Sequence, residues 1–85
     1  MHPRNRHGVF NYPVDPVALN LPTYTEVIKH PMDFGTIKRR LDEGLYVAVD
    51  DFVADVELVF TNARTFNPPN HYIHVDAALV QYMPR

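Results

Sequence analysis

Hydrophobic side chains recur every three or four positions after residue 33, and this spacing predicts amphipathic helices. A first helix is expected over residues 34–43, and its apolar stripe consists of Phe34, Ile37 and Leu41. Asp33 is a suitable N-cap, because its carboxylate can accept a backbone N–H of the first turn. Gly44 is expected just beyond the end of this helix, where a left-handed backbone conformation favours glycine.

A second, longer helix is expected over residues 50–66. Its stripe consists of Phe52, Val56, Val59, Phe60, Ala63 and Phe66. The acidic pair Asp50 and Asp51 suits the positive end of the helix dipole at its start. A third helix is expected over residues 71–83, ended by Pro84, with one face formed by Val75, Ala78, Leu79 and Tyr82.

Residues 1–33 follow a different pattern. They hold five of the eight prolines and show little helical periodicity before the sequence TYTEVIKH. Their apolar side chains argue against disorder, and these are Val9, Phe10, Val14, Val17, Leu19 and Leu21. We therefore expect a long, stiff connection that packs against the helices. Since no alternating strand pattern or internal repeat occurs, the predicted fold class is all-α, in one module over residues 1–85.

Composition agrees with one small globular domain. The chain has 85 residues, of which 46% are hydrophobic and 12% aromatic. A net charge of −2 gives no electrostatic reason to expect nucleic acid as the main partner. The chain has no cysteine, which excludes disulfides and thiolate zinc sites. No apolar run approaches the roughly 18 residues needed to cross a bilayer, and no signal-peptide core follows the first residues, so we expect a soluble intracellular module.

Few residues suggest catalysis, a metal or a cofactor. His71 and His74, with Asp76 nearby, have a spacing that metal sites use, but no further ligand cluster supports this reading. The sequence KRR at residues 38–40 could contact nucleic acid, but neighbouring acidic residues favour a solvated helix face. No nucleophile with a base, no phosphate-binding loop and no pair of catalytic carboxylates is found. We therefore expect neither enzymatic activity nor a cofactor.

Asn67 is the polar residue with the most restricted setting. Pro68 and Pro69 follow it, and proline can neither donate an N–H nor continue a helix. The residue before a proline is itself disfavoured in the helical conformation. Asn67 is thus held at a helix exit, either as a simple helix C-cap, where asparagine is favoured, or as a ligand-binding amide.

A resemblance then enters through two linked stretches. The two stretches that carry this resemblance are PVDPVALNLPTYTEVIKHPMDFGTIKRRLDEGLY and, after it, ADVELVFTNARTFNPPNH. The chain resembles bromodomains, most of all those of the bromodomain and extra-terminal group. The similarity covers residues 9 to 80. It implies a left-handed four-helix bundle whose first and last connections frame a pocket for N-acetyl-lysine. It also implies a nuclear reader of acetylated peptides, with histone tails as partners.

The resemblance assigns roles to individual residues. Asn67 is expected to donate a hydrogen bond to the acetyl carbonyl, which Tyr24 reaches through a bound water. Phe66 stands where a tyrosine is usual, beside Asn67. The apolar lining is expected from Phe10 on the floor, from the loop residues Val14, Leu19 and Leu21, and from Ile73 as gatekeeper. For these lining residues, ordinary core packing is the alternative.

The chain also departs from the family pattern. Gly8 and Val9 replace the Trp-Pro pair of the usual aromatic shelf, which puts ligand affinity in doubt. The alternative is therefore a helical protein-interaction module that binds acetyl-lysine weakly. Ala48 occupies a position where asparagine often caps the long helix, so the cap is expected to shift to Asp50.

Only a short polar segment precedes Val9, whereas the family has a first helix there. We therefore expect an incomplete bundle with an uncovered apolar face, formed by Phe34, Ile37, Val56 and Phe60. The gross burial at stake is about 1.5–3 kcal/mol for each large apolar side chain. Self-association between copies, or marginal stability, is the expected consequence.

Overall fold

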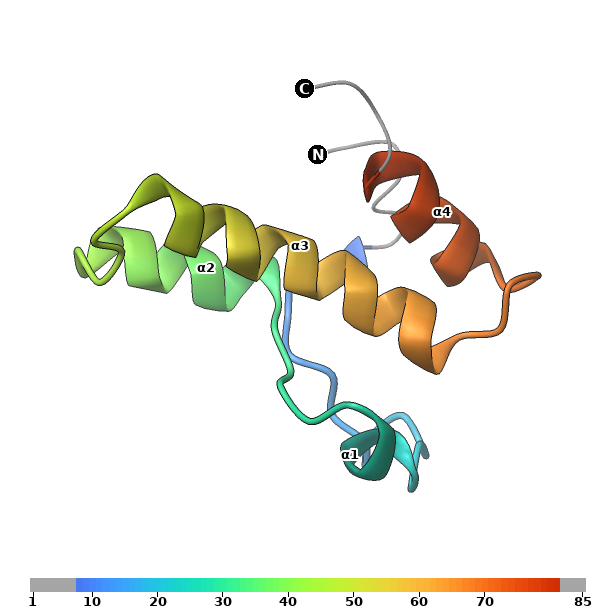
Figure 1. The fold of residues 1–85 in the computed structure, drawn as a ribbon. Helices are drawn as coiled ribbons and strands as arrows, with labels where there is room; N and C mark the ends of the chain where they lie inside the picture. The colour runs from blue at the N-terminus through green and yellow to red at the C-terminus, as the bar shows by residue number, and fades with distance from the viewer. Residues whose placement is uncertain (1–7, 82–85) are drawn as a thin grey trace.

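The computed structural model describes residues 8–81, and this part of the chain is entirely helical and loop (Figure 1). The helices are α1 (Tyr24–Val27), α2 (Phe34–Asp42), α3 (Val49–Phe66) and α4 (Tyr72–Gln81). The predicted all-α class is confirmed, since no strand occurs among the described residues. None of the helices described is both long enough and apolar enough to span a membrane.

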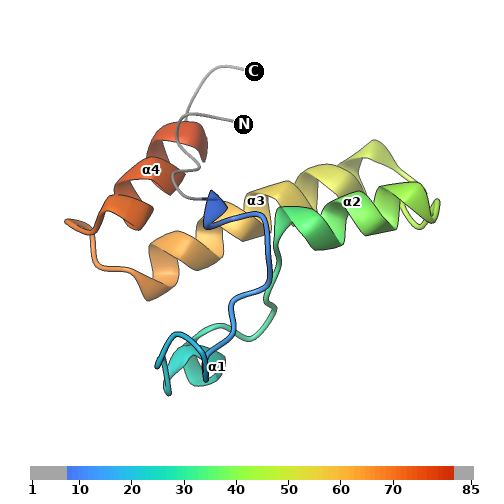
Figure 2. The same cartoon turned by 180° about the vertical axis from the view of Figure 1, so that it is seen from behind.

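The long helix α3 is the centre of the fold. Helix α2 lies alongside its first half, and α4 packs against it after a sharp reversal of the chain (Figures 1 and 2). The connection over residues 8–33 runs away from this group and back again, carrying the single turn of α1 at its far end (Figure 2). The buried apolar core consists of Phe10, Ile37, Val59, Phe60 and Ala77.

Aromatic rings join the loop to the two neighbouring helices. The ring of Phe10 meets that of Phe60 edge-on at a centroid distance of 5.4 Å, and that of Phe34 at 6.2 Å. Such edge-to-face pairs add about 0.5–1.5 kcal/mol beyond the apolar area that they bury. The start of the long loop is therefore part of the core rather than a surface segment.

The two ends of α2 follow local rules that the sequence displays. The Asp33 carboxylate accepts the backbone N–H of Thr36 at 3.0 Å, and Asp33 is 4% exposed. At the other end Gly44 has a φ of 67°, and its N–H donates to the carbonyl of Leu41 at 3.1 Å. The predicted N-cap and the predicted glycine are both confirmed.

Two further N–H groups at the start of α2 are satisfied by the long loop. The carbonyl of Phe10 accepts from Phe34 at 2.7 Å, and the carbonyl of Asn11 accepts from Gly35 at 2.9 Å. A Cβ atom at position 35 would lie only 2.7 Å from that Asn11 oxygen. Glycine is therefore required here because the loop approaches the helix so closely.

The start of α3 differs from the prediction. Ala48 is the N-cap, with an extended backbone (φ −123°, ψ 152°) and no side-chain capping bond. The expected shift of the cap to Asp50 is wrong, because the chain is already helical at Val49. Asp50 and Asp51 lie within the first turn, where their charges favour the helix dipole without capping it.

The packed face of α4 was also predicted wrongly. Val75 and Leu79 are 39% and 43% exposed, whereas the face turned toward the core consists of Ile73, Asp76, Ala77 and Val80. The residues of both faces recur at helical spacing. The prediction favoured the face without Asp76, because charged side chains usually face water. Asp76 is nevertheless only 2% exposed. The predicted end of this helix, from Tyr82 to Pro84, lies outside the described residues.

The apolar face that was expected to lack cover is covered. Ile37 and Phe60 are each 4% exposed, and Phe34 and Val56 pack against the same cluster as half-buried side chains. The loop residue Phe10 and helix α4 supply the missing contacts. The expectation that these four residues form an uncovered face is therefore wrong, whereas self-association between copies stays a prediction.

Candidate binding site around Asn67

Asn67 ends α3 and is its C-cap. Its backbone is extended (φ −93°, ψ 137°), as Pro68 requires, and its N–H donates to the carbonyl of Ala63 at 3.1 Å. Its side-chain Nδ2 donates to the same carbonyl at 2.9 Å. Among the described residues the second hydrogen on Nδ2 and the oxygen Oδ1 have no partner. The C-cap thus fixes the amide while one of its two N–H donors and its oxygen remain available to a ligand.

His74 holds the main chain of Asn67 from the opposite side. Its Nδ1 lies 2.9 Å from the carbonyl oxygen of Asn67 and 3.0 Å from that of Arg64. Carbonyls at a helix C-terminus have no partner within the helix, so the ring supplies one from α4. From the sequence, His74 is a candidate metal ligand only, because a contact seven residues away across a turn leaves no local pattern.

The two histidines do not form a metal centre with Asp76 in this structure. The Nδ1 atom of His71 accepts the backbone N–H of Ile73 at 3.1 Å, so that lone pair is used. In the described part of the chain, no three His, Asp or Glu side chains are grouped closely enough to hold a metal ion. Each ring serves the main chain of the turn between α3 and α4.

Tyr24 and Phe66 form an aromatic pair next to Asn67. Their ring centroids are 4.8 Å apart with an interplanar angle of 66°, and Tyr24 is 7% exposed. Burial raises the pKa of the Tyr24 phenol, so the hydroxyl stays neutral and able to donate. This hydroxyl has no hydrogen-bond partner within residues 8–81. The single turn α1 thus places a buried aromatic ring and a neutral hydroxyl against the end of α3.

A buried side chain of α3 anchors the loop that carries Tyr24. Asn62 is 8% exposed, and its Nδ2 donates to the carbonyl of His30 at 2.8 Å. Sequence reasoning missed this residue. The available signal was an asparagine inside an apolar helix stripe, where it is unfavourable unless its amide is satisfied.

The same loop is ordered by a turn near Asp15. The Asp15 carboxylate accepts the N–H groups of Val17 and Ala18 at 3.0 and 3.1 Å. Asn20 adopts a left-handed conformation with a φ of 54°, which asparagine tolerates better than most residues. The proline-rich segment is therefore a series of hydrogen-bonded turns, as its composition suggests.

The predicted lining residues fall into two groups. Phe10 belongs to the core cluster and Ile73 packs against it, whereas Val14 and Leu21 are half-buried in the loop. Leu19 is 59% exposed. The structure brings the rings of Tyr24 and Phe66 together at the end of α3 that Asn67 caps. The role of Val14, Leu19 and Leu21 as a pocket wall stays a prediction.

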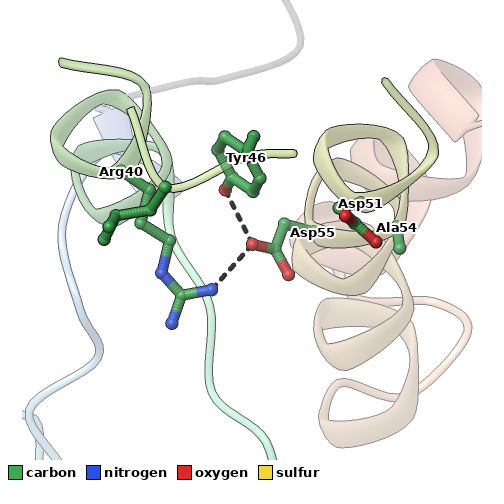
Figure 3. Close-up of a pocket in the computed structure, with 6 residues that line it drawn as sticks. Arg40, Tyr46, Asp51, Ala54 and Asp55 are labelled. Carbon is green, nitrogen blue, oxygen red and sulfur yellow. Dashed lines mark hydrogen bonds and ion pairs between the residues drawn. The ribbon is translucent and has the colours of Figure 1, made fainter. Parts of the chain in front are cut away.

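An open depression of about 440 Å³ lies at the other end of α3 (Figure 3). Its lining comes from Arg40, Leu45, Tyr46, Asp51, Ala54 and Asp55. The Asp55 carboxylate accepts from Arg40 at 2.8 Å and from the Tyr46 hydroxyl at 2.6 Å. Burial, and then the bond to Asp55, raise the pKa of Tyr46. These groups satisfy one another, so this cluster connects α2 to α3 rather than offering a ligand site.

Comparison with known proteins agrees with this architecture. The family described as "Bromodomain" matches residues 2–79. "Transcription factor GTE10" of Arabidopsis thaliana is 54% identical over 68 residues, which cover 80% of this chain and 6% of that protein. "Transcription factor GTE9" of the same plant is 52% identical over 69 residues, covering 81% of this chain and 10% of that protein.

A similar relative occurs in yeast. "Bromodomain-containing factor 1" of Saccharomyces cerevisiae is 46% identical over 74 residues, covering 82% of this chain and 11% of that protein. The chain therefore spans only a small part of the length of these relatives. The resemblance read from the sequence, to bromodomains of the bromodomain and extra-terminal type, is confirmed, and such a module is not an enzyme. The chain belongs to the bromodomain family.

Proposed function

We propose that this chain is a non-catalytic reader that binds N-acetyl-lysine through the side-chain amide of Asn67. The observation that supports this most is the Asn67 amide at the end of α3, of whose two side-chain N–H groups only one has a partner among the described residues. One N–H is bonded to the Ala63 carbonyl at 2.9 Å, which fixes the orientation of the group. Acetylation converts a lysine into a neutral amide whose carbonyl can accept the other N–H.

The surroundings of Asn67 support an apolar, uncharged ligand. The rings of Tyr24 and Phe66, 4.8 Å apart, offer an apolar wall for the lysine stem. The neutral Tyr24 hydroxyl can donate to a water that bridges to the acetyl carbonyl, a contact nearly as favourable in enthalpy as a direct bond. An unmodified lysine would carry its charge into this wall, at a cost of several kcal/mol if it is not paired.

The partners that we propose are acetylated histone tails, bound in the nucleus during transcriptional regulation. This proposal rests on family membership and on the names of two relatives as transcription factors. A basic tail also suits a chain with a net charge of −2.

Titration of acetylated and unmodified histone-tail peptides by calorimetry tests the proposal. We expect binding of the acetylated peptide alone. Asn67→Ala should lower the affinity by about tenfold or more, because it strands the acetyl carbonyl. Asn70→Ala changes an exposed asparagine in the same turn and should bind like the parent. Tyr24→Phe should weaken binding less than Asn67→Ala, because only a water-mediated contact is lost.

Two outcomes would contradict the proposal. If Asn67→Ala binds the acetylated peptide as tightly as the parent, the assigned site is wrong. If acetylated and unmodified peptides bind equally, the chain does not read acetylation. Thermal unfolding of each variant shows whether a loss of binding comes from a loss of fold.

A protein-interaction module is the second candidate function. The end of α2, the connection that follows it and the start of α3 expose several apolar side chains, namely Leu41 (51%), Leu45 (58%), Val47 (95%) and Val49 (77%). Exposed apolar groups of this kind can mark a contact surface. Self-association through them would appear as a concentration-dependent mass in light scattering after size-exclusion chromatography. Val47→Asp and Val49→Asp together should abolish that dependence, and a monomer at all concentrations would contradict this candidate.

A further inference from the structure

We propose that His74 is a positioning residue for Asn67. Its ring Nδ1–H binds the carbonyls of Arg64 and Asn67 and so fixes the main chain that carries the ligand-binding amide. The inference rests on the proposed function for its effect on ligand affinity. The geometry on which it depends consists of the two contacts from His74 to main-chain carbonyls.

The protonation of the His74 ring follows from its partners. Both contacts of Nδ1 are carbonyl oxygens, at 2.9 and 3.0 Å, and a carbonyl oxygen can only accept. Nδ1 must therefore carry the hydrogen, which the two acceptors share as a three-centre bond. His71 is the opposite case, because its Nδ1 accepts the N–H of Ile73 at 3.1 Å and must lack a hydrogen. The two rings are thus predicted to be different tautomers.

The contact matters because, within residues 8–81, the other hydrogen bonds of Asn67 all go to α3. Its N–H and its Nδ2 both bind the carbonyl of Ala63, within α3. Pro68 has no N–H, so the next residue adds no hydrogen bond of that kind. The bond from His74 to the Asn67 carbonyl is the one that ties this residue to α4. Because hydrogen bonds join Asn67 to both α3 and α4, rotation of its peptide groups is restricted. The second hydrogen of its side-chain amide therefore keeps one direction.

The same bond completes the end of α3. The carbonyls of the last helical turn lack partners within the helix, and a half-buried carbonyl without a partner is costly. His74 satisfies the carbonyl of Arg64 in that turn as well as that of Asn67 just beyond it. A single ring therefore links helix termination to the orientation of the binding amide.

Three substitutions separate the hydrogen bond from the shape of the ring. His74→Asn places an amide nitrogen at the same distance from Cβ as Nδ1, so it can donate to the same carbonyls. The aspartate of His74→Asp has the same shape as asparagine, but its carboxylate can only accept hydrogen bonds. The leucine of His74→Leu is apolar and forms none. We expect His74→Asn to bind acetylated peptide within about threefold of the parent. His74→Asp and His74→Leu should bind about tenfold more weakly, the factor expected for a lost hydrogen bond to a buried group. His30→Asn, at an exposed histidine, is the control and should bind like the parent.

Nitrogen-15 NMR of the unliganded parent tests the geometry without any variant. We expect a hydrogen on Nδ1 of His74 and none on Nδ1 of His71. The side-chain amide signals of Asn67 should shift in His74→Leu and return toward the parent position in His74→Asn. A hydrogen absent from Nδ1 of His74, or Asn67 signals that do not respond, would overturn the inference.

The binding results distinguish this inference from the proposed function. If the parent and His74→Leu bind acetylated peptide equally, positioning by His74 is wrong while the proposed function stands. If the parent itself binds no acetylated peptide, the proposed function fails, and the claimed effect of His74 on affinity fails with it. Rescue by His74→Asn but not by His74→Asp supports the inference.

Discussion

The two ends of α3 are held in different ways, and the difference indicates which end is available to a ligand. At the first end, the Asp55 carboxylate binds both Arg40 and Tyr46, so each polar group is satisfied by a neighbour (Figure 3). At the second end, main-chain carbonyls accept bonds from side chains, and one N–H of the Asn67 amide has no partner in the described part of the chain. Polar groups that all bind one another stabilise the contact between two helices. A polar group that is held in place but keeps an unused donor can bind a ligand with that donor.

Distance makes the two ends independent. Asp55 and Asn67 are twelve residues apart, which is about 18 Å along a helix. Substitutions separated by more than about 7–10 Å without shared partners usually have additive effects. Changes at the first end should therefore act on stability and changes at the second on binding.

The largest effect on stability is expected from Asp55→Ala. Its side chain is 17% exposed, and its removal leaves the Tyr46 hydroxyl and the Arg40 guanidinium without this acceptor. We expect the free energy of unfolding to fall by about 1–2 kcal/mol, most of it from the hydrogen bonds rather than from the partly exposed ion pair. Urea unfolding measures this.

The affinity for acetylated peptide should stay unchanged in this variant. Lys38→Ala is the matched control, because its ion pair with Asp42 is on an exposed helix face. It should change the free energy of unfolding by less than about 0.5 kcal/mol. If Asp55→Ala lowered peptide affinity as much as Asn67→Ala does, the two ends would not be independent.

Much of this comparison was visible in the sequence, because it depends on short-range rules. Asp33 and Gly44 were identified as the ends of α2 from capping preferences alone, and the structure confirms both. Asn67 was singled out because two prolines follow it. Such features are decided by neighbours within a few residues, so a single sequence is enough to find them.

The features that were missed depend on contacts between distant segments. Asn62 reaches His30 across 32 positions, and His74 reaches the end of the preceding helix. The packed face of α4 was wrong because the helix is apolar on more than one side, so periodicity could not choose between faces. The buried carboxylate of Asp76 contradicted the rule that charged residues face water.

Gly8→Trp is expected to have the next largest effect. The resemblance places position 8 at the mouth of the binding pocket, where an aromatic side chain would enlarge the apolar surface. Gly8 has a φ of 64°, however, and an added Cβ would lie 2.9 Å from the Nδ2 atom of Asn11. A left-handed backbone costs a side-chain-bearing residue about 1–2 kcal/mol.

We therefore expect Gly8→Trp to lower the melting temperature, without the gain in peptide affinity that the missing shelf would suggest. Gly8→Ala separates the backbone effect from the size of the indole and should lower the melting temperature by a similar amount. Gly44→Ala is a second control, since its φ is 67° but its added Cβ meets nothing within 4 Å. A stable Gly8→Trp variant with higher affinity would show that the loop adapts.

The smallest effect concerns the tyrosines at the two ends at high pH. Burial raises the pKa of Tyr24, so the folded chain holds this phenol proton more tightly than the unfolded chain does. The stability from the neutral phenol is complete below about pH 10, the ordinary value for tyrosine, and is lost as the pH rises through the folded pKa. Tyr46 contributes to the pH dependence in the same direction, because burial and its bond to Asp55 also raise its pKa.

Unfolding by urea at about pH 9 and about pH 11 should therefore show a loss of stability in the parent. Tyr24→Phe should reduce that loss whether or not Asp55 is present, whereas Tyr46→Phe should reduce it more in the parent than in Asp55→Asn. An identical loss in the parent and in Tyr24→Phe would mean that the Tyr24 ring is not buried against Phe66. The end of α3 next to Asn67 would then lack the aromatic wall proposed for the ligand.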